Sequence, residues 1–585
     1  MVERAHRSSP PPAAGRRLGA GLALLAFLCL TVALAPRARA QDEWLNIRLN
    51  SDTTTELQNE EQVAINPTDA NNMVAVWRDF RLGYRQVAWG YTFDGGATWT
   101  DGGLFVEPNY PYQSDPGVTA DRHGNFYAIV LSFTNTSSPN GFYVYKSTNG
   151  GVSWGPPMEV INGVPNVFED KEFIACDRTD SPHADNLYVV WTRFYTTQIL
   201  MRRSTNGGWL WDPTVTVSDQ NGVQFPIPVV GPQGELYVAW TRYSPAAIMF
   251  DVSTDGGSSF GTDRQVTTVY TASTVLNGGI NAYGSPHMDA DISTGPYRGR
   301  VYVAFMDRRA GYGDFDIWVT SSDDQGVSWT TPVRVNDDPV NNGRDQFLPW
   351  LVVDNLGVVT VVFLDRRHDP QNRTYHCVLT QSFDGGATWE PNVQVSGVAS
   401  DPQYAALAGP LDAGSESGTG GPAGAVGAAG DGPVPSVEPS RAGLLGEYIG
   451  VTSWNGRPTP IWTDIRNFHQ DAYAGYLSGG AGVARPAAAA IGWRLPNPVA
   501  AGAGAAMRLT WRGADPPAGA PVRILDAQGR LLRLLEPAWR PAGAGFDARL
   551  NWDGLDAAGG RLPAGVYLLR LDGAGSAAHK LVLAN

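Results

Sequence analysis

The sequence predicts an all-β protein built from repeated four-stranded sheets, and three observations support this prediction. First, a phrase of the form S/T-x-D/N-x-G-x-S/T-W recurs six times, with small departures, in the 585 residues. Second, short apolar runs typical of strands stand at fixed places between the copies. Third, 19 Trp and 68 Gly fit a fold in which tight turns and aromatic side chains join many short strands. A closed ring of such sheets, a β-propeller, accounts for all three observations.

The repeated phrase has the chemistry of a tight turn. Its clearest copies are residues 92–99 and 382–389, and Asp or Asn occupies its third position at 94, 149, 206, 255, 324 and 384. A carboxylate or amide at that position accepts hydrogen bonds from the N–H groups that follow, and the glycines supply positive φ. The gaps of 55, 57, 49, 69 and 60 residues fit one blade with variable loops. We expect the terminal aromatic residue to pack into the neighbouring sheet.

The number of innermost strands predicts seven blades within residues 41–479. These strands begin near Glu61, Asp115, Glu172, Gln224, His287, Gln346 and Glu447. The last repeat lacks both the phrase and a fourth strand, whereas residues 44–50, before the first repeat, have the character of a fourth strand. We expect this segment to complete the last blade, because ring closure removes exposed sheet edges. A six-bladed ring is the alternative.

Residues 1–40 indicate a secretory signal peptide. A basic start is followed by an apolar run, residues 18–35, and by the small-x-small sequence Ala38-Arg39-Ala40. We expect cleavage after Ala40 and a secreted, extracellular or cell-surface protein with no further membrane span. A retained membrane anchor is the alternative. The formal net charge of −14 argues against nucleic acid as a partner.

Two other segments interrupt or follow the repeats. Residues 409–440 consist mostly of Gly, Ala, Pro and Ser, which predicts a disordered insertion inside the propeller, and residues 480–490 indicate a linker. Cys176 and Cys377 lie on predicted strands of different repeats, so we expect buried free thiols.

The repeated phrase resembles the Asp box, or BNR repeat, of sialidase-like β-propellers. The resemblance covers residues 41–479 and implies the propeller fold. The runs at residues 493–498, 522–530, 550–554 and 563–571 resemble FlgD-type immunoglobulin-like domains of bacterial secreted proteins. This second resemblance implies a small Ig-like β-sandwich over residues 491–585, which serves as a spacer, a sorting tag or a cell-surface attachment module.

Four Asp-x-Arg pairs follow the second strand of their repeats. They are Asp79/Arg81, Asp307/Arg309, Asp365/Arg367 and Asp464/Arg466. Because consecutive strands alternate in direction, we expect these pairs on the face opposite to the Asp boxes, which we call the mouth face. One hypothesis is that the arginines surround a central funnel and hold a carboxylate by forked contacts. The other is that each Asp–Arg pair bridges blades or caps its loop.

Polar residues also mark the starts of the innermost strands. They include Glu60, Glu61, Asp115, Asp170, Lys171, Glu172, His287, Asp289, Asp345, Glu447 and Tyr448. The sialidase resemblance implies a Tyr nucleophile activated by a Glu, an Asp acid/base and three arginines on the sugar carboxylate. It assigns catalysis to Tyr448, Glu61 and Asp79, and substrate binding to Arg81, Arg309, Arg367, Arg466, Asp115 and Asp345. The Arg-Ile-Pro motif that opens sialidase domains is absent, and residues 46–50 match it poorly.

Two functions from different classes follow from the sequence. The first is a sialidase-like exo-glycosidase that acts on sialylated or related acidic glycans. The second is a noncatalytic propeller that binds an extracellular glycan or protein at its funnel and is displayed or exported through its C-terminal domain. The sequence leaves open whether the protein is an enzyme. His287 and His368 lack metal-ligand spacing, so we predict neither a metal site nor a cofactor.

Overall fold

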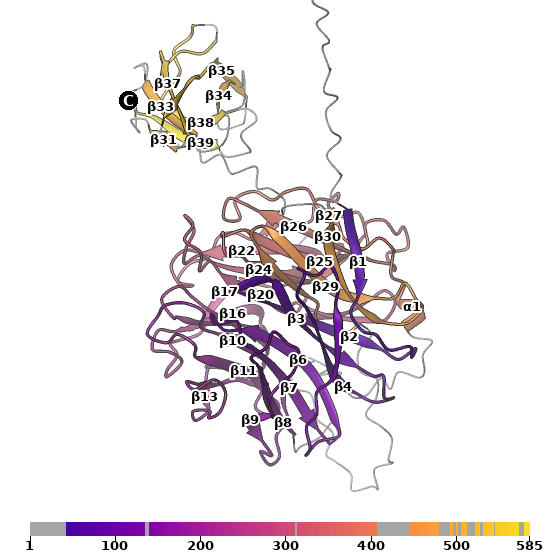
Figure 1. Ribbon diagram of the computed structural model, residues 1–585. Coiled ribbons are helices and arrows are strands. Elements are labelled where there is room, and N and C mark those ends of the chain that lie inside the picture. The colour runs from indigo at the N-terminus through magenta and orange to yellow at the C-terminus, as the bar shows by residue number, and fades with distance from the viewer. Residues whose placement is uncertain are drawn as a thin grey trace, which may run out of the picture. The chain divides into compact units, whose positions relative to one another are not determined.

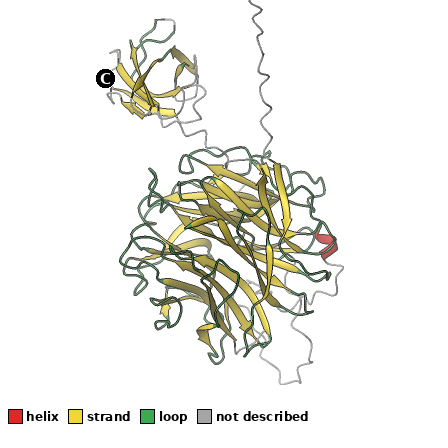
Figure 2. Ribbon diagram, in the orientation of Figure 1, coloured by secondary structure: helices red, strands yellow, loops and turns green. Residues whose placement is uncertain are grey.

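The computed structural model describes residues 43–134, 140–309, 313–405 and 445–478, together with parts of the C-terminal region, which are residues 492–494, 499–500, 505–511, 521–526, 530–542, 545–557, 559–571 and 578–584. The expected signal peptide, insertion and linker lie outside the described residues. Within them the secondary structure is almost all strand, and the only helix is the short α1 (Pro402–Ala405) (Figure 2). No helix of the described part is long and apolar enough to cross a membrane.

Seven four-stranded antiparallel sheets form the propeller, so the predicted seven blades are confirmed. Blade 1 consists of β2 (Gln58–Asn66), β3 (Asp69–Asp79), β4 (Gln86–Thr92) and β5 (Thr100–Leu104). Blade 2 consists of β6 (Tyr112–Ala120), β7 (Phe126–Phe133), β8 (Asn140–Ser147) and β9 (Met158–Asn162). Blade 3 consists of β10 (Glu169–Cys176), β11 (Leu187–Arg193), β12 (Gln198–Ser204) and β13 (Val215–Thr216).

Blades 4 to 7 complete the ring. Blade 4 consists of β14 (Val223–Val230), β15 (Leu236–Tyr243), β16 (Ala246–Ser253) and β17 (Arg264–Thr268), and blade 5 of β20 (His287–Ala290), β21 (Val301–Asp307), β22 (Asp316–Ser322) and β23 (Val333–Arg334). Blade 6 consists of β24 (Gln346–Val353), β25 (Val359–Asp365), β26 (His376–Ser382) and β27 (Val393–Gln394). Blade 7 consists of β28 (Gly450–Trp454), β29 (Arg457–Asp464), β30 (Asp471–Ser478) and β1 (Glu43–Arg48). A hairpin that the sequence analysis did not predict, β18 (Ser273–Leu276) with β19 (Ile280–Tyr283), joins blades 4 and 5.

The ring closes as the sequence predicts. Strand β1 pairs with β30 in antiparallel register from Glu43↔Ser478 to Arg48↔Tyr473, so the two ends of the propeller chain share one sheet. In Figure 1 the indigo β1 lies beside the orange β30. The innermost strand of each blade contacts that of the next blade in chain order, and β28 contacts β2. The edge that an open ring would expose on β30 is therefore paired.

The Asp boxes and the Asp-x-Arg pairs lie on opposite faces of the ring. In blade 1 the box follows β4, and the Gly95 N–H donates at 2.9 Å to the carbonyl of Asn71, near the start of β3 and next to the β2–β3 connection. Asp79, at the other end of β3, pairs in register with Gln58 at the start of β2. The mouth face therefore carries the connections between the second and third strands and those between blades, as predicted.

Each blade is held by aromatic side chains that it shares with its neighbours. Trp77, Trp191, Trp240 and Trp462 stand on the second strand of their blades and are fully buried. The residues that end the Asp boxes are partly buried against the hydrophobic clusters of the ring; they are Trp99, Trp154, Trp211, Phe260, Trp329 and Trp389. This confirms the expected wedge at the end of each box. Cys176 and Cys377 are buried and free, also as expected.

The C-terminal region contains two further sheets. One has the strand order β31 (Gly492–Arg494), β33 (Ala505–Trp511), β37 (Gly545–Trp552), β36 (Ala538–Ala542), and the other β32 (Val499–Ala500), β39 (Ala578–Ala584), β38 (Gly565–Leu571), β34 (Val522–Leu525), β35 (Leu531–Leu535). Buried residues of both sheets, among them Leu509, Trp552 and Leu569, form one hydrophobic cluster. The region is a small β-sandwich.

Candidate functional site

The innermost strands share a bulge near their mouth-face ends. In blades 1, 2, 3, 4 and 6 the pairing of the first two strands shifts register at equivalent places. The residue inside each bulge has positive φ, at 47 to 59°, and these residues are Glu60, Asp115, Lys171, Phe225 and Leu348. Because a bulge turns one residue out of the regular alternation, it changes which side chain is directed toward the axis.

Charged side chains from different blades meet at this level. Lys171 Nζ lies 3.1 Å from Asp115 Oδ2 in blade 2 and 2.6 Å from Glu447 Oε2 just before blade 7. Arg78 Nη1, on the second strand of blade 1, lies 3.2 Å from Glu60 Oε1, and both side chains are buried. We call the charged residues that meet here the axial cluster: Glu60, Arg78, Asp115, Asp170, Lys171, Glu172 and Glu447.

The axial cluster holds five carboxylic groups and two basic groups, so it carries three excess negative charges when all are ionised. Burial alone would raise the pKa of Asp115, but the Lys171 ammonium and the Ser114 hydroxyl lower it to about 2. For Glu172, burial and then the charge of Asp115 raise the pKa well above its ordinary value. The pKa values of these two neighbouring carboxyl groups are thus shifted in opposite directions.

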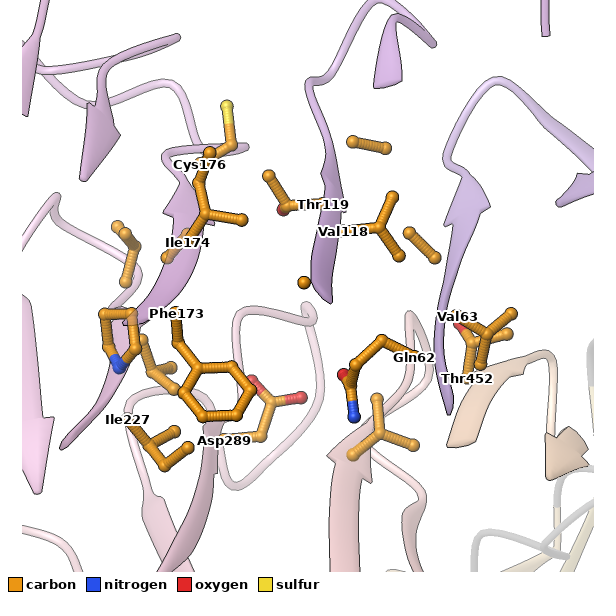
Figure 3. Close-up of a pocket in the computed structure, with 18 of the residues that line it drawn as sticks. Gln62, Val63, Val118, Thr119, Phe173, Ile174, Cys176, Ile227, Asp289 and Thr452 are labelled. Atoms are coloured by element: carbon orange, nitrogen blue, oxygen red, sulfur yellow. The ribbon is translucent and has the colours of Figure 1, made fainter. Parts of the chain in front are cut away.

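An aromatic layer closes the axis below the axial cluster. Tyr448 lies with its ring centroid 5.4 Å from Phe173 and 6.1 Å from Trp350, and the His287 ring lies 4.4 Å from Trp350. Beyond this layer, toward the Asp-box face, a cavity of ≈160 Å³ runs between the innermost strands. Figure 3 shows Gln62, Phe173 and Asp289 around it.

Tyr448 is buried and already hydrogen-bonded. Its hydroxyl donates to the Pro116 carbonyl at 2.9 Å, and burial together with the charges of Glu60, Asp115 and Glu172 raises its pKa well above the ordinary value. The predicted partner, Glu61, faces elsewhere, because its carboxylate accepts the Thr463 hydroxyl at 3.1 Å. Burial raises the pKa of Glu61 as well. Of the two adjacent glutamates, Glu60 is the one whose charge raises the pKa of Tyr448.

The Asp-x-Arg arginines do not converge on the axis. Each lies close to the Asp of its own pair, with nearest N–O distances of 2.7 Å for Arg81, 2.7 Å for Arg367, 2.8 Å for Arg466 and 3.9 Å for Arg309. Three also reach an outermost strand or the residues that follow one: Arg81 contacts Asp101 at 3.0 Å, Arg367 contacts Asp337 at 2.5 Å and Arg466 contacts Asn46 at 2.8 Å. Arg309 stacks over Trp318 with 5.1 Å to the ring centroid. Arg367 thus joins blades 6 and 5, whereas Arg81 and Arg466 contact their own blades, and these contacts correspond to the hypothesis that each pair bridges blades or caps its loop.

The remaining predicted site residues support loops. Asp79 accepts the Trp77 indole N–H at 2.9 Å in addition to Arg81. Asp345 accepts the Phe315 N–H and the Asn372 amide, at 3.1 and 2.7 Å. Of the predicted site residues, Asp115 belongs to the axial cluster and Tyr448 to the aromatic layer beside it, while Arg78 was not predicted. A charged residue at a buried position of a strand, between Trp77 and Asp79, was the signal for it.

The fold and the mouth face define a seven-bladed β-propeller whose axis is closed by a charged cluster over an aromatic layer. No protein-family model matches the sequence, and neither does any curated protein. Among solved structures, the chain is similar to a protein of unknown function from Dyadobacter fermentans, with 14% identity, a TM-score of 0.39 and coverage of 56% of this chain and 94% of that one.

Two similar structures are of named enzymes. A leech intramolecular trans-sialidase has 12% identity and a TM-score of 0.41 over 55% of this chain and 67% of its own. A GH93 α-L-arabinofuranosidase of Fusarium graminearum, solved with arabinobiose, has 12% identity and a TM-score of 0.39 over 54% of this chain and 92% of its own. Similarities this slight do not bear on the chemistry of the site.

Proposed function

We propose that the protein is a noncatalytic propeller that binds neutral glycans on its mouth face. The observation that carries this proposal is a pair of exposed aromatic residues in strained backbone. Tyr195, on the β11–β12 connection, has φ of 78° and is 62% exposed; Phe468, on the β29–β30 connection, has φ of 67° and is 67% exposed. Both connections lie on the mouth face.

Both side chains are mostly exposed although their backbone is strained. A bulky residue with positive φ is about 1–3 kcal/mol less favourable than one in an ordinary conformation. A side chain that stays mostly in water recovers little of this energy by burial. Exposed aromatic rings are suited to contact the apolar face of a sugar ring, and a third, Tyr270, stands on the same face between blades 4 and 5.

The charges on the mouth side favour a neutral sugar over an acidic one. The Asp-x-Arg guanidinium groups are bound to carboxylates, and the axial cluster has an excess of negative charge. A sialic acid carboxylate at the axial cluster would meet an excess of like charge, and the four Asp-x-Arg guanidinium groups already lie beside carboxylates. The Asp-box and FlgD-type resemblances and the expected signal peptide are consistent with display outside the cell, which is part of this proposal.

Binding to an array of neutral and sialylated oligosaccharides, followed by titration calorimetry, tests the proposal. We expect binding to neutral members, weakened about tenfold or more by Tyr195→Ala and by Phe468→Ala. Trp209→Ala is the matched control, because Trp209 is 65% exposed in the same blade as Tyr195 but lies in an Asp box on the opposite face. Equal loss with Trp209→Ala, or binding that requires sialic acid, would refute it.

A second candidate, sialidase-like hydrolysis, is favoured by one observation. The charge of Glu60, in blade 1, raises the pKa of Tyr448, just before blade 7, and a tyrosine with a glutamate is the pair that the sialidase resemblance implies. Release of fluorophore from a sialoside by the wild-type chain, lost in both Tyr448→Phe and Glu60→Gln, would establish this function. Absence of release from the folded wild-type chain would eliminate it.

A further inference from the structure

Three carboxylic groups of the axial cluster lie in one compact group. Asp115 belongs to β6, and Asp170 and Glu172 belong to β10 of the next blade. One oxygen atom from each lies within 4.8 Å of the others. The group exists because the bulges in β6 and β10 interrupt the strand alternation, so that residues around positions 115 and 171 are turned toward each other across the blade boundary.

Glu172 is the exceptional member of this group. Its side chain is 99% buried, since its relative exposure is 1%. Within the described part of the chain, neither of its carboxylate oxygens accepts a hydrogen bond from another residue. A buried carboxylate without a donor is strongly unfavourable, and in native proteins such a group points to a bound ion or water. The two other members each lie near the Lys171 ammonium, at 3.1 Å for Asp115 and 3.6 Å for Asp170.

Lys171 supplies too little positive charge for its surroundings. Its ammonium is shared among Asp115, Asp170 and Glu447. Arg78 is engaged by Glu60 and by the Asn59 side chain, which accepts from its Nε at 2.7 Å. Because the five carboxylic groups of the axial cluster outnumber its two basic groups, a divalent cation would reduce the excess of negative charge around Glu172.

We propose that Asp115, Asp170 and Glu172 bind one Ca²⁺ ion on the propeller axis. All three ligands are hard carboxylate oxygens, with no thiol or imidazole among them, which excludes a typical Zn²⁺ set and suits Ca²⁺. Ca²⁺–oxygen distances of about 2.3–2.6 Å allow ligand atoms up to about 5.2 Å apart across the ion. The observed spread of at most 4.8 Å fits inside that limit.

Ca²⁺ fits this group better than Mg²⁺ does. Mg²⁺ dehydrates reluctantly and keeps several waters, whereas Ca²⁺ accepts six to eight oxygens in irregular geometry and uses bidentate carboxylates. Asp115 and Glu172 are buried and Asp170 is half-buried, so the surroundings offer little room for a hydrated ion. The site goes beyond the proposed glycan binding, because none of its ligands belongs to the exposed aromatic set.

The test uses the full secreted-form chain, beginning at Gln41, after dialysis against a chelator. We expect calorimetric titration with CaCl₂ to show one site per chain, and saturating Ca²⁺ to raise Tm by about 3 °C or more, because an ion that binds only the folded state stabilises it. MgCl₂ at the same concentration should give less than half of this shift. No heat of binding and no Tm shift with up to 10 mM CaCl₂ would overturn the proposal.

Isosteric variants locate the ion. Glu172→Gln and Asp170→Asn should each weaken Ca²⁺ binding at least tenfold and remove the Tm response, whereas Asp289→Asn, a half-buried acid on β20 beside the axial cavity, should keep it. If Glu172 holds only a proton, Glu172→Gln will unfold at the wild-type temperature in chelator and the wild-type chain will not respond to Ca²⁺. A Ca²⁺ response retained by both ligand variants would place the ion elsewhere and refute the assignment.

Discussion

At the scale of single residues, His287 in the aromatic layer makes the stability of the fold depend on pH. Its ring is buried against Trp350, its Nδ1 has no hydrogen-bond partner in the described part, and burial lowers its pKa to about 3. The folded state therefore keeps this imidazole neutral at pH values where the unfolded chain, with a pKa near 6.5, binds a proton. Stability linked to His287 is complete above about pH 6.5 and is lost as pH falls from there toward 3.

The variant His287→Phe removes this titration and retains an aromatic ring against Trp350. We expect the wild-type free energy of unfolding to fall by about 2 kcal/mol more than that of the variant between pH 7 and pH 5, since each unit below the unfolded pKa contributes about 1.4 kcal/mol. Urea unfolding at the two pH values measures the difference. Parallel losses in the two proteins would show that His287 is not titrating as the structure implies.

The residues of the axis also show where sequence reasoning succeeds and fails. Polar residues at the starts of the innermost strands were predicted, and several of them meet. Tyr448 was predicted to pair with Glu61, but the Glu61 carboxylate accepts the Thr463 hydroxyl, and Glu60 is the glutamate whose charge raises the pKa of Tyr448. The cause is the bulge at Glu60, since simple alternation of side chains does not count the extra residue. Contacts such as Lys171–Glu447 depend on how seven blades close, and no local pattern encodes them.

At the scale of elements, the Asp box is a preformed turn. In the last copy, the Ser382 and Thr388 hydroxyls and the Thr388 N–H all donate to Asp384, at 2.6 to 2.9 Å. Five copies carry Gly at the fourth position with φ of 68 to 75°, and the fifth copy carries Gln325 at 57° instead. These contacts follow from residue types and spacing alone, which is why this element could be predicted from the sequence.

Two glycines with nearly the same φ allow the cost of a positive φ to be measured apart from the cost of a steric clash. Gly207 and Gly385 have φ of 72 and 71°, but a Cβ at Gly385 would lie 2.6 Å from the Tyr297 ring, whereas at Gly207 its nearest neighbour would be Lys146 Nζ at 3.3 Å. We expect Gly207→Ala to cost about 1 kcal/mol through positive φ, and Gly385→Ala to cost about 1–3 kcal/mol more through the displaced ring. Chemical unfolding at pH 7 compares the two, and equal losses would contradict the contact with Tyr297.

At the scale of the whole molecule, the blade number and ring closure were predicted because repeats can be counted and a missing strand noticed. The β18–β19 hairpin and α1 were not predicted, since both lie outside the repeating pattern. The mouth face was placed correctly from the alternation of strands. The role of its arginines was left open between two hypotheses. The sequence gives the position of each arginine along the chain, but it does not show which carboxylates on the outermost strands, such as Asp101, the arginine contacts.

Closure by β1 is the whole-molecule feature most open to test. Asn46 joins blades 6 and 7: its amide donates to the Val395 carbonyl at 2.9 Å, and its oxygen accepts the Gly397 N–H at 2.7 Å and Arg466 Nη2 at 2.8 Å. A chain that begins at Ser51 lacks β1 and leaves β30 as an unpaired edge, so we expect Tm to fall by about 10 °C or more and aggregation to increase. The chain beginning at Gln41 is the reference.

Asn46→Ala separates these polar contacts from the strand itself. It keeps the β1–β30 pairing but removes three hydrogen bonds, so we expect a loss of about 1–3 kcal/mol and no aggregation. Scanning calorimetry and light scattering on the three chains decide the outcome. If the chain from Ser51 unfolds at the reference temperature, β1 is dispensable and the ring is held by contact between β28 and β2 alone. If β1 closes the ring, the Tm of the Asn46→Ala chain should lie between that of the reference chain and that of the chain that begins at Ser51.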